Sequence, residues 1–334
     1  MSAPSPAGLA LAVLNPGGRD AEQSFATAGS LSPQAGGHPP VNYHAYAACT
    51  GGGFYREAGR IPAAQRAVLL LLRRDLKKAA RVLETLQAGG KTVAVVFKEA
   101  GRHQVAALFA GEPERLRWFR EICARADFCL ASTPDLLPLY HGAGARRALF
   151  LPTPYPVDLP EWDFSQPPES RRGIFIGTRE FEVPSRNHLA ALLAVRELGE
   201  PVTVINRDGR AGRRMLEALG YPAERLRVVE GPLPYPEYLR LMAGHRLVFQ
   251  LDRSGVPGQV AGDALLCRVP CVGGDGAVDQ LAYPWWSGGG APESGGITPA
   301  RRVLGGETHP FLERAQERLS FAAIAASLRA AFAA

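Results

Sequence analysis

The sequence predicts an α/β protein with two parallel-sheet domains, followed by C-terminal helices that pack back on the body. Short β-branched or apolar runs alternate with amphipathic helical stretches along the chain, which is the pattern of parallel sheets. Residues 151–172 contain six prolines and interrupt this alternation, because such a segment forms neither regular helix nor central strand. The length of 334 residues and the hydrophobic content of 46% also favour two domains over one.

The expected elements follow the same alternation on both sides of the proline-rich segment. In the first half, strands are expected at residues 9–14, 67–72, 92–97, 128–131 and 148–151, and helices at 76–88, 114–126 and 134–141. In the second half, strands are expected at 173–176, 202–206, 226–229, 247–251 and 270–273, and helices at 187–198, 210–219, 236–243 and 259–267. Residues 284–306, rich in Gly and Pro, predict a long loop. We expect domains at 1–158 and 159–300 and C-terminal helices at 301–334.

The C-terminal run THPFLERAQERLSFAAIAASLRAAFAA predicts two helices. The second is amphipathic, with an apolar stripe formed by Phe321, Ile324, Leu328 and Phe332. Its polar side is poor in Lys and Arg, which membrane-surface helices use to bind anionic lipid. We therefore expect this stripe to dock against the protein's own body.

Composition limits which cellular compartment and which binding partners are expected. The longest apolar stretch is too short to cross a bilayer, and the first residues lack a positively charged start, so we expect a cytoplasmic protein. The five cysteines lie mostly inside apolar runs, which favours core packing over disulfides or a zinc site. The net charge of +6 comes from scattered arginines, so nucleic acid is not expected as a partner. A phosphorylated small molecule and peripheral contact with an anionic membrane surface both stay open.

The loop after the strand at 173–176 reads GTREFEVPSRNH and carries the first candidate site. Gly177 permits a close backbone approach, and Arg179 and Arg186 lie on the loop that leads into a helix. The start of this helix, Ser185 or Asn187, can present free backbone N–H groups. Guanidinium groups beside a helix N-terminus suit a diphosphate. The alternative is two solvated arginines on a surface loop.

A lone carboxylate, Asp263, lies about one turn inside the expected helix at 259–267, after the small residues SGVPG. In that place it interacts favourably with the helix dipole, which is the structural explanation. The functional explanation is an acceptor for two ribose hydroxyls near the carboxyl end of a strand.

The run GDALLCRVPCVGG resembles the donor-sugar signature of retaining glycosyltransferases with the GT-B fold, of the group 1, family 4-like kind. In that family Glu-Ala-Met-Ala-Cys-Gly-x-Pro-Val-Val follows a Gly-rich turn. Aligned on Pro270, Asp263 takes the place of the second Glu of a Glu, seven residues, Glu motif. Further segments, among them GIFIGTREFEVPSRNHLAALLAV and YPEYLRLMAGHRLVFQLDRSG, match in the same order, so the resemblance covers most of residues 92–283.

The resemblance implies two Rossmann-like domains that face a central cleft, with the nucleotide sugar bound by the second. It puts Arg179 near the family's Arg and Arg186 or Asn187 near its Lys. Gly255 occupies the first Glu position, so a carboxylate there must come from Asp252 or be absent. The implied donor-binding set in the second half is Arg179, Arg186, Asn187, Asp252, Gly258, Gln259 and Asp263.

The first half offers candidates for the acceptor side. After the strand at 92–97 come Lys98, Glu99 and His103, and the resembling family has a functional His after an equivalent strand; alternatively, these residues only cap the next helix. Gly17 and Gly18, after the first strand, can present backbone N–H groups to a leaving diphosphate, or simply form a tight turn. Residues 42–59, with Tyr, His and three consecutive glycines, predict a mobile loop over the cleft or an ordinary ordered loop.

These features lead to one main hypothesis and several alternatives. The main hypothesis is transfer of a sugar from a nucleotide-diphosphate sugar, with retention, without a metal and with no cofactor beyond the donor itself, to an acceptor that is a glycan, a lipid-linked molecule or a small molecule. The alternatives are a sugar-nucleotide epimerase or hydrolase on the same fold, and a non-catalytic nucleotide-sugar-binding or scaffold protein. A dinucleotide-dependent dehydrogenase is poorly supported, because NPGGRD lacks Gly-x-Gly-x-x-Gly.

Overall fold

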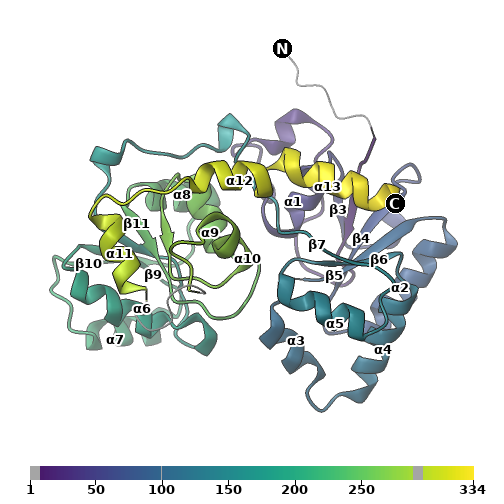
Figure 1. The fold of residues 1–334 in the computed structure, drawn as a ribbon, viewed down its shortest axis with the longest axis horizontal. Helices are drawn as coiled ribbons and strands as arrows, with labels where there is room; N and C mark the ends of the chain where they lie inside the picture. Colours follow the sequence, from purple (N-terminus) through teal and green to yellow (C-terminus); the bar gives the residue numbers. More distant parts are fainter. Residues whose placement is uncertain (1–7, 99, 289–295) are drawn as a thin grey trace. The chain divides into compact units, whose positions relative to one another are not determined.

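The computed structural model describes residues 8–98, 100–288 and 296–334 (Figure 1). The chain forms two compact units. Unit 1 comprises Met1–Glu161 and Glu317–Ala334, and unit 2 comprises Trp162–Gln316. The chain therefore leaves unit 1 within the proline-rich segment and returns to it within the segment that was expected to hold only C-terminal helices.

Unit 1 is built on a seven-stranded sheet in the order β2-β3-β1-β4-β5-β6-β7. All neighbouring strands are parallel except β2, which pairs antiparallel with β3. The strands are β1 (Ala12–Leu14), β2 (Gln23–Ser24), β3 (Gly53–Tyr55), β4 (Ala67–Leu72), β5 (Thr92–Phe97), β6 (Phe128–Ala131) and β7 (Ala148–Phe150). Alternate residues of β4 enter separate cores on the two faces of the sheet, as a strand buried on both faces requires.

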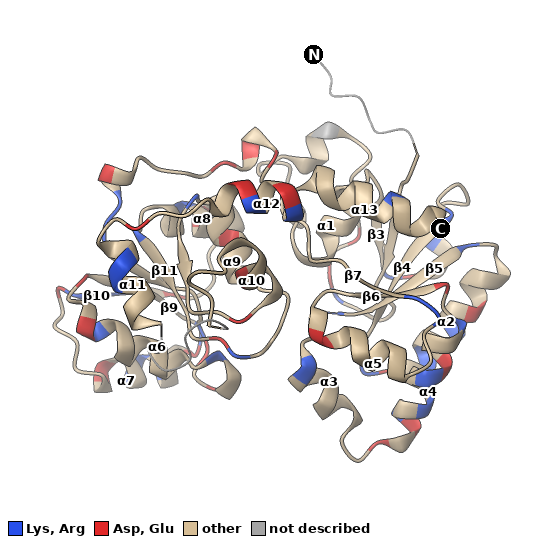
Figure 2. Ribbon diagram, in the orientation of Figure 1, with Lys and Arg blue, Asp and Glu red and all other residues tan. Residues whose placement is uncertain are grey.

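Helices cover both faces of this sheet. They are α1 (Asn42–Ala48), α2 (Leu76–Ala88), α3 (Arg102–Phe109), α4 (Pro113–Arg125), α5 (Leu137–Gly142) and α13 (Phe321–Ala333). Residues from α2, α4 and α5 pack in one core, and residues from α1 and α13 pack in the other. Figure 2 shows positive and negative residues interspersed along α4, where Arg117 pairs with Glu114 at 2.8 Å.

The expectation of a mobile loop at residues 42–59 is wrong. These residues form α1 and β3, and Tyr43, His44 and Tyr46 are buried. The hydroxyl of Tyr43 donates to the Phe97 carbonyl at 2.5 Å, and that of Tyr46 donates to the Leu151 carbonyl at 2.9 Å. The aromatic residues thus anchor a core helix, since a buried tyrosine hydroxyl needs such a partner.

Unit 2 is built on a five-stranded parallel sheet in the order β10-β9-β8-β11-β12. The strands are β8 (Ile174–Ile176), β9 (Val202–Asn206), β10 (Leu226–Glu230), β11 (Leu247–Phe249) and β12 (Cys271–Val272). The helices are α6 (His188–Val195), α7 (Gly209–Ala218), α8 (Tyr235–Ala243), α9 (Gln259–Leu266), α10 (Ala277–Ala282) and α11 (Ile297–Leu304). Helix α12 (Phe311–Leu319) begins in unit 2 and ends in the second stretch of unit 1. The expected long loop at 284–306 is wrong for Ile297–Leu304, which form α11, and its residues 289–295 lie outside the described residues.

The last helix, α13, packs on unit 1 through the predicted stripe. Phe321, Ile324 and Leu328 are buried in the core that also holds α1, and Phe332 packs edge-on against Phe128 with ring centroids 4.9 Å apart. Both carboxylate oxygens of Asp158 accept backbone N–H groups at the start of the helix. The fold class is therefore as the sequence predicted: α/β, with two parallel-sheet units and C-terminal helices that pack on them.

Candidate functional site

The strand orders locate where ligands are expected to bind. In an open parallel sheet, the crevice lies outside the carboxyl ends of the strands at the point where the strand order reverses. In unit 2 this point lies between β8 and β11, because β9 and β10 follow on one side of β8 and β11 lies on the other. The loops after these two strands, residues 177–187 and 250–258, carry most of the predicted donor-binding residues.

The loop after β8 is held close to the neighbouring helix. A Cβ at Gly177 would lie 2.3 Å from a Val260 methyl carbon, so only glycine fits where β8 ends against α9. The Thr178 hydroxyl and His188 Nδ1 share a hydrogen bond of 2.9 Å, which fixes the base of the loop to α6. The half-buried Arg179 guanidinium lies over the Tyr238 ring, 5.4 Å from its centroid.

The loops after β8 and β11 are joined directly. Arg186 Nη1 donates to Asp252 Oδ2 at 2.7 Å, and Asn187 Nδ2 donates to the Leu251 carbonyl at 2.9 Å. The second Asp252 oxygen accepts the Ser254 backbone N–H, and the Ser185 and Ser254 hydroxyls lie 2.7 Å apart. The structure thus brings together three of the predicted residues, Arg186, Asn187 and Asp252.

Gly255, the residue without the expected carboxylate, has an acid beside it from another loop. Its φ is +60°, in the left-handed region that favours glycine. Its backbone N–H donates to Asp275 Oδ1 at 3.0 Å, and the Asp275 N–H donates to the Asp252 carbonyl at 3.2 Å. Sequence reasoning missed Asp275, although its position after β12, in the GGDG turn, was a usable signal.

Asp263 is buried, with 1% of its surface exposed. The Tyr235 hydroxyl donates to its Oδ1 at 2.5 Å, while Oδ2 has no hydrogen-bond partner among the described residues. Burial raises the pKa of this carboxyl to about 7, although the Tyr235 hydroxyl and the Arg179 charge oppose the rise. The side chain contacts Tyr235, the first residue of α8, and is not exposed at the ends of the loops. A ribose could therefore reach it only if some of the surrounding side chains moved.

Gly258 and Gln259 lie where the loop after β11 enters α9. Gly258 has φ +96°, and a Cβ there would lie 2.9 Å from Asp279 Oδ2. Gln259 is the first, half-buried residue of α9. Asp279, which sequence reasoning also missed, is 2% exposed and accepts a hydrogen bond of 2.9 Å from Gln250 Nε2. Burial, with the charges of Asp252 and Asp275, raises the pKa of Asp279 to about 8.

In unit 1 the strand order reverses at β1, between β3 and β4. The loop after β1 carries Gly17 and Gly18, and a Cβ at Gly18 would lie 2.1 Å from Asn15 Nδ2. That same amide donates to Asp20 Oδ2 at 2.5 Å, and Lys98 Nζ pairs with this oxygen at 3.1 Å. Although burial opposes the effect, Lys98 lowers the pKa of Asp20. The sequence reading missed Asn15 and Asp20, which the polar run after the first strand could have indicated.

The other acceptor-side candidates are His103 and Glu99. His103 is exposed on α3, and its Nε2 lies 3.5 Å from the Arg102 Nε that points at it. Glu99 lies outside the described residues. The roles suggested for these residues stay predictions.

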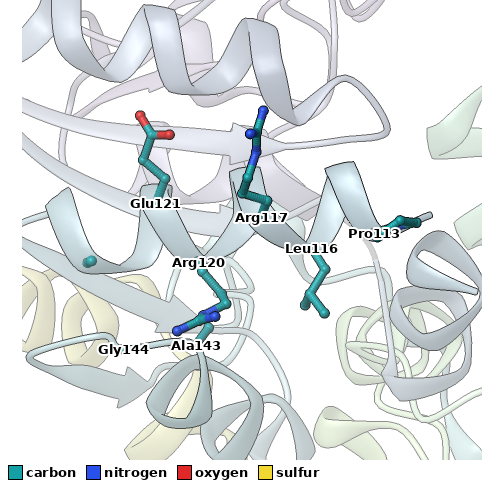
Figure 3. A pocket seen from close by; sticks show the side chains of 8 residues that line it. Pro113, Leu116, Arg117, Arg120, Glu121, Ala143 and Gly144 are labelled. Atoms are coloured by element: carbon teal, nitrogen blue, oxygen red, sulfur yellow. The ribbon is translucent and has the colours of Figure 1, made fainter.

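A separate hollow in unit 1 coincides with none of the predicted residues. It has a volume of about 460 Å³ and is lined by α4 and by Ala143 and Gly144. Figure 3 shows Leu116 and Arg120 extending from α4 on the side of these two residues, whereas Arg117 and Glu121 point away. It therefore lies along a helix face and not at the carboxyl ends of the strands.

The described residues were also considered as possible metal ligands and as possible membrane-spanning helices. Within residues 8–98, 100–288 and 296–334, no three His, Cys, Asp or Glu side chains are grouped so that they could hold a metal ion. None of the described helices is long and apolar enough to span a bilayer.

The chain is similar to known proteins in its structure. The Anabaena protein HepE, in complex with UDP and glucose, superposes with a TM-score of 0.62 over 98% of this chain and 100% of its own, at 12% identity. The chain has the GT-B fold. An α,α-trehalose 6-phosphate synthase from Burkholderia multivorans gives a TM-score of 0.54 at 12% identity, covering 81% of this chain and 74% of its own. A UDP-forming α,α-trehalose-phosphate synthase from Burkholderia xenovorans, in complex with glucose-6-phosphate, gives 0.56 at 11% identity, covering 80% and 72%.

At the level of sequence there is no such match. No known protein family matches the chain, and no curated protein does. The structural neighbours are only about 12% identical in sequence, so the likeness to them establishes the fold alone. Which residues act must be argued from the site itself.

Proposed function

We propose that the protein is a glycosyltransferase that moves a sugar from a nucleotide-diphosphate sugar to an acceptor, with retention and without a metal ion. The observation that carries this proposal is the pair of linked loops at the switch point of unit 2, where Arg186 is fixed by the 2.7 Å ion pair with Asp252 and Arg179 lies on the same loop. A guanidinium fork suits a diphosphate, and this edge of the sheet is where such a ligand is expected.

Arg186 keeps donors for a ligand while it is held in place. The ion pair uses one N–H of Nη1, and a guanidinium has five N–H donors in a fixed fork. Its side chain is 35% exposed, whereas that of Asp252 is 7% exposed. Asp252 thus acts as a positioning residue, which orients the arginine before the diphosphate arrives. Charge that grows on the departing diphosphate is then stabilised by a group already in place.

Asp263 is proposed to accept ribose hydroxyls, with Oδ2 as the acceptor without a protein partner. This role requires that its cover opens on binding, because only 1% of the residue is exposed. Gly258 and Gln259, at the start of α9, are proposed to let the nucleotide approach the backbone. UDP is the first nucleotide to test, since HepE was solved with UDP and glucose.

Unit 1 is proposed to serve the acceptor. Lys98 and Asp20 form a 3.1 Å ion pair beside the Gly17–Gly18 turn, at the carboxyl ends of the strands. A carboxylate with a lowered pKa stays ionised near neutral pH and can accept a hydrogen bond from an acceptor hydroxyl, while the lysine supplies positive charge beside it.

A second candidate function is a nucleotide-sugar-binding protein without catalysis. The observation that favours it is the combination of a glycine at position 255 with a buried Asp263, so that neither acidic position presents an open carboxylate. Turnover, rather than binding, separates the two candidates.

The test has a binding arm and a turnover arm. Nucleoside diphosphates and their sugars are screened by thermal shift on the unaltered chain, on Arg186→Gln and, as a control of equal charge loss, on Arg214→Gln, an exposed residue of α7. Stabilisation by one nucleotide that Arg186→Gln abolishes and Arg214→Gln keeps would support the donor site. No response to any nucleotide would refute it. Release of the nucleoside diphosphate from that donor, followed by NMR of the product's anomeric proton, tests transfer and retention.

A further inference from the structure

Unit 2 has a basic hollow at the opposite edge of its sheet from the proposed donor site. The hollow has a volume of about 360 Å³. Its charged and titratable lining residues are Arg172, Glu224, Arg225, Arg227, Arg240 and His245. We call it the amino-edge hollow.

Its place follows from the strand bounds. Arg172 precedes β8, Val202 and Thr203 begin β9, Arg225 and Arg227 flank the first residue of β10, and Gly244 and His245 precede β11. All four strands are parallel, so their amino ends share one edge of the sheet, and the loops after β8 and β11 lie at the other. The amino-edge hollow is therefore separate from the loops that hold Arg179 and Arg186.

The lining is strongly and asymmetrically charged. It contains four arginines and a single carboxylate, Glu224, while burial lowers the pKa of His245 and keeps that imidazole neutral. Among the described residues, none of the four arginines forms an ion pair. This contrasts with Arg213 and Arg246 of the same unit, which pair with Glu230 at 2.9 Å and with Glu200 at 3.1 Å.

Contacts to neutral groups hold some of these arginines in position. Arg172 Nη1 donates to the Glu169 and Arg171 carbonyls at 2.5 and 2.7 Å, and Arg225 Nη2 lies 3.3 Å from the Arg196 carbonyl. Arg225 Nε is buried and has no hydrogen-bond partner within the described residues. The Arg240 guanidinium lies 5.8 Å from the centroid of the Phe164 ring.

Four arginines line this hollow beside a single carboxylate, so that like charges outnumber opposite ones and repel one another. A bound anion with several oxygens would relieve this repulsion, since phosphate oxygens accept paired guanidinium N–H bonds. We propose that the amino-edge hollow binds a ligand that carries two or more phosphate-type charges, independently of the donor site. The shared chemistry has two sources, a soluble phosphorylated molecule and a phosphate-bearing lipid headgroup.

The test uses inorganic pyrophosphate as the probe and the full chain as the protein. Calorimetric titrations compare the unaltered chain with Arg227→Gln/Arg240→Gln in the hollow. The matched control is Arg214→Gln/Arg301→Gln, which removes the same charge from exposed residues of α7 and α11. A third variant, Arg179→Gln/Arg186→Gln, removes the donor-site arginines. Circular dichroism and thermal melting establish that each variant is folded.

We expect the hollow variant to bind pyrophosphate about tenfold more weakly or worse, with the control unchanged and the affinity falling as salt rises. The donor-site variant should keep this binding, while the hollow variant should keep any response to nucleotides. If pyrophosphate binding depends on Arg179 and Arg186 alone, or falls equally in the control, the proposal is wrong.

Vesicles then separate the two sources. Flotation with phosphatidic acid vesicles, against phosphatidylcholine vesicles, is run on the same variants. Recovery with phosphatidic acid that requires Arg227 and Arg240 supports the hollow with a lipid headgroup as its ligand. Pyrophosphate binding without such recovery supports it with a soluble ligand. If neither probe binds in an Arg227- and Arg240-dependent way, the proposal fails whatever the donor site does.

Discussion

The backbone N–H of Gly255 donates a 3.0 Å hydrogen bond to the carboxylate of Asp275. The two residues come from different loops, one after β11 and the other after β12. At the position where the resembling glycosyltransferases carry a glutamate, this chain has a glycine with φ +60°. The carboxylate beside this glycine is that of Asp275, on the loop after β12. A glutamate at 255 would need a left-handed backbone, which costs an L-residue about 1–2 kcal/mol.

Asp275 is therefore expected to matter for function. Asp275→Asn should lower the transfer rate by about tenfold or more, because the amide keeps the shape but loses the charge beside Gly255. The measurement is kcat with the donor found in the nucleotide screen. Asp163→Asn, at an aspartate of unit 2 that pairs with Arg268, serves as the control. Unchanged kcat in Asp275→Asn would remove this residue from the site.

Replacing Arg186 should lower both the affinity for nucleoside diphosphates and the stability of the fold. Arg186→Gln should weaken nucleoside diphosphate binding by about tenfold or more, because a diphosphate loses its guanidinium partner. It should also lower the free energy of unfolding by about 1 kcal/mol, since the buried Asp252 carboxylate loses its ion pair to a half-exposed arginine. Calorimetry and urea denaturation measure the two effects. Asp252→Asn should weaken binding less, because the arginine remains. Weaker binding in Asp252→Asn than in Arg186→Gln would contradict a positioning role.

The buried carboxyl of Asp279 should make stability fall as pH rises. Its folded-state pKa of about 8 lies above the model-peptide value, so the folded state binds more protons than the unfolded state between about pH 4 and pH 8. Over that window the free energy of unfolding decreases with pH, by at most about 1.4 kcal/mol per pH unit for this group. Asp279→Asn should flatten the decrease and be more stable than the unaltered chain near pH 8. Urea denaturation between about pH 5 and pH 9 measures it; parallel curves for the two proteins would refute the assignment.

Lys98 should act in transfer without acting in donor binding. Lys98→Met should lower kcat, because the Asp20 carboxylate loses its 3.1 Å partner and its pKa rises, while nucleotide affinity stays the same. The pH profile of kcat should shift upward on its acid side. Lys77→Met, on the exposed face of α2, is the control. A parallel loss of nucleotide affinity would place Lys98 on the donor side instead.

The docking of α13 should contribute to the stability of unit 1. Leu328→Ala should lower the free energy of unfolding by about 2–5 kcal/mol, because this side chain is fully buried in the core shared with α1. Ser327→Ala, on the exposed side of the same helix, should change it by less than about 0.5 kcal/mol. Equal effects of the two changes would show that the helix does not dock as described.

Several strands could be predicted from the sequence because their apolar runs are continuous. The strands expected at 67–72, 92–97 and 202–206 have those bounds in the structure, because each coincides with a buried apolar run. The strands expected at 9–14 and 247–251 are shorter in the structure, at Ala12–Leu14 and Leu247–Phe249. Helix α1 was missed because its tyrosines and histidine look polar in sequence. Their burial depends on partners such as the Phe97 and Leu151 carbonyls, which lie far away along the chain.

The sequence predicted individual site residues within each loop, but few of the contacts between loops. Arg186, Asn187 and Asp252 come together because two neighbouring strands end at one edge, which the strand order implies. The contact between Gly255 and Asp275 joins residues 20 positions apart and depends on the exact course of both loops. The burial of Asp263 under α8 follows from helix packing, which a pattern of residues along one helix does not reveal.

Because α13 completes the core of unit 1, that unit is assembled from two stretches of chain separated by all of unit 2. During synthesis, the ribosome makes unit 2 before it makes this helix. At typical translation rates of about 5–20 residues per second, the apolar face that Phe321, Ile324 and Leu328 will cover stays open for roughly 10–30 seconds after residue 161 has been made. Synthesis of unit 1 therefore starts before that of unit 2 and ends after it, so a chaperone has a longer opportunity to bind unit 1 than unit 2.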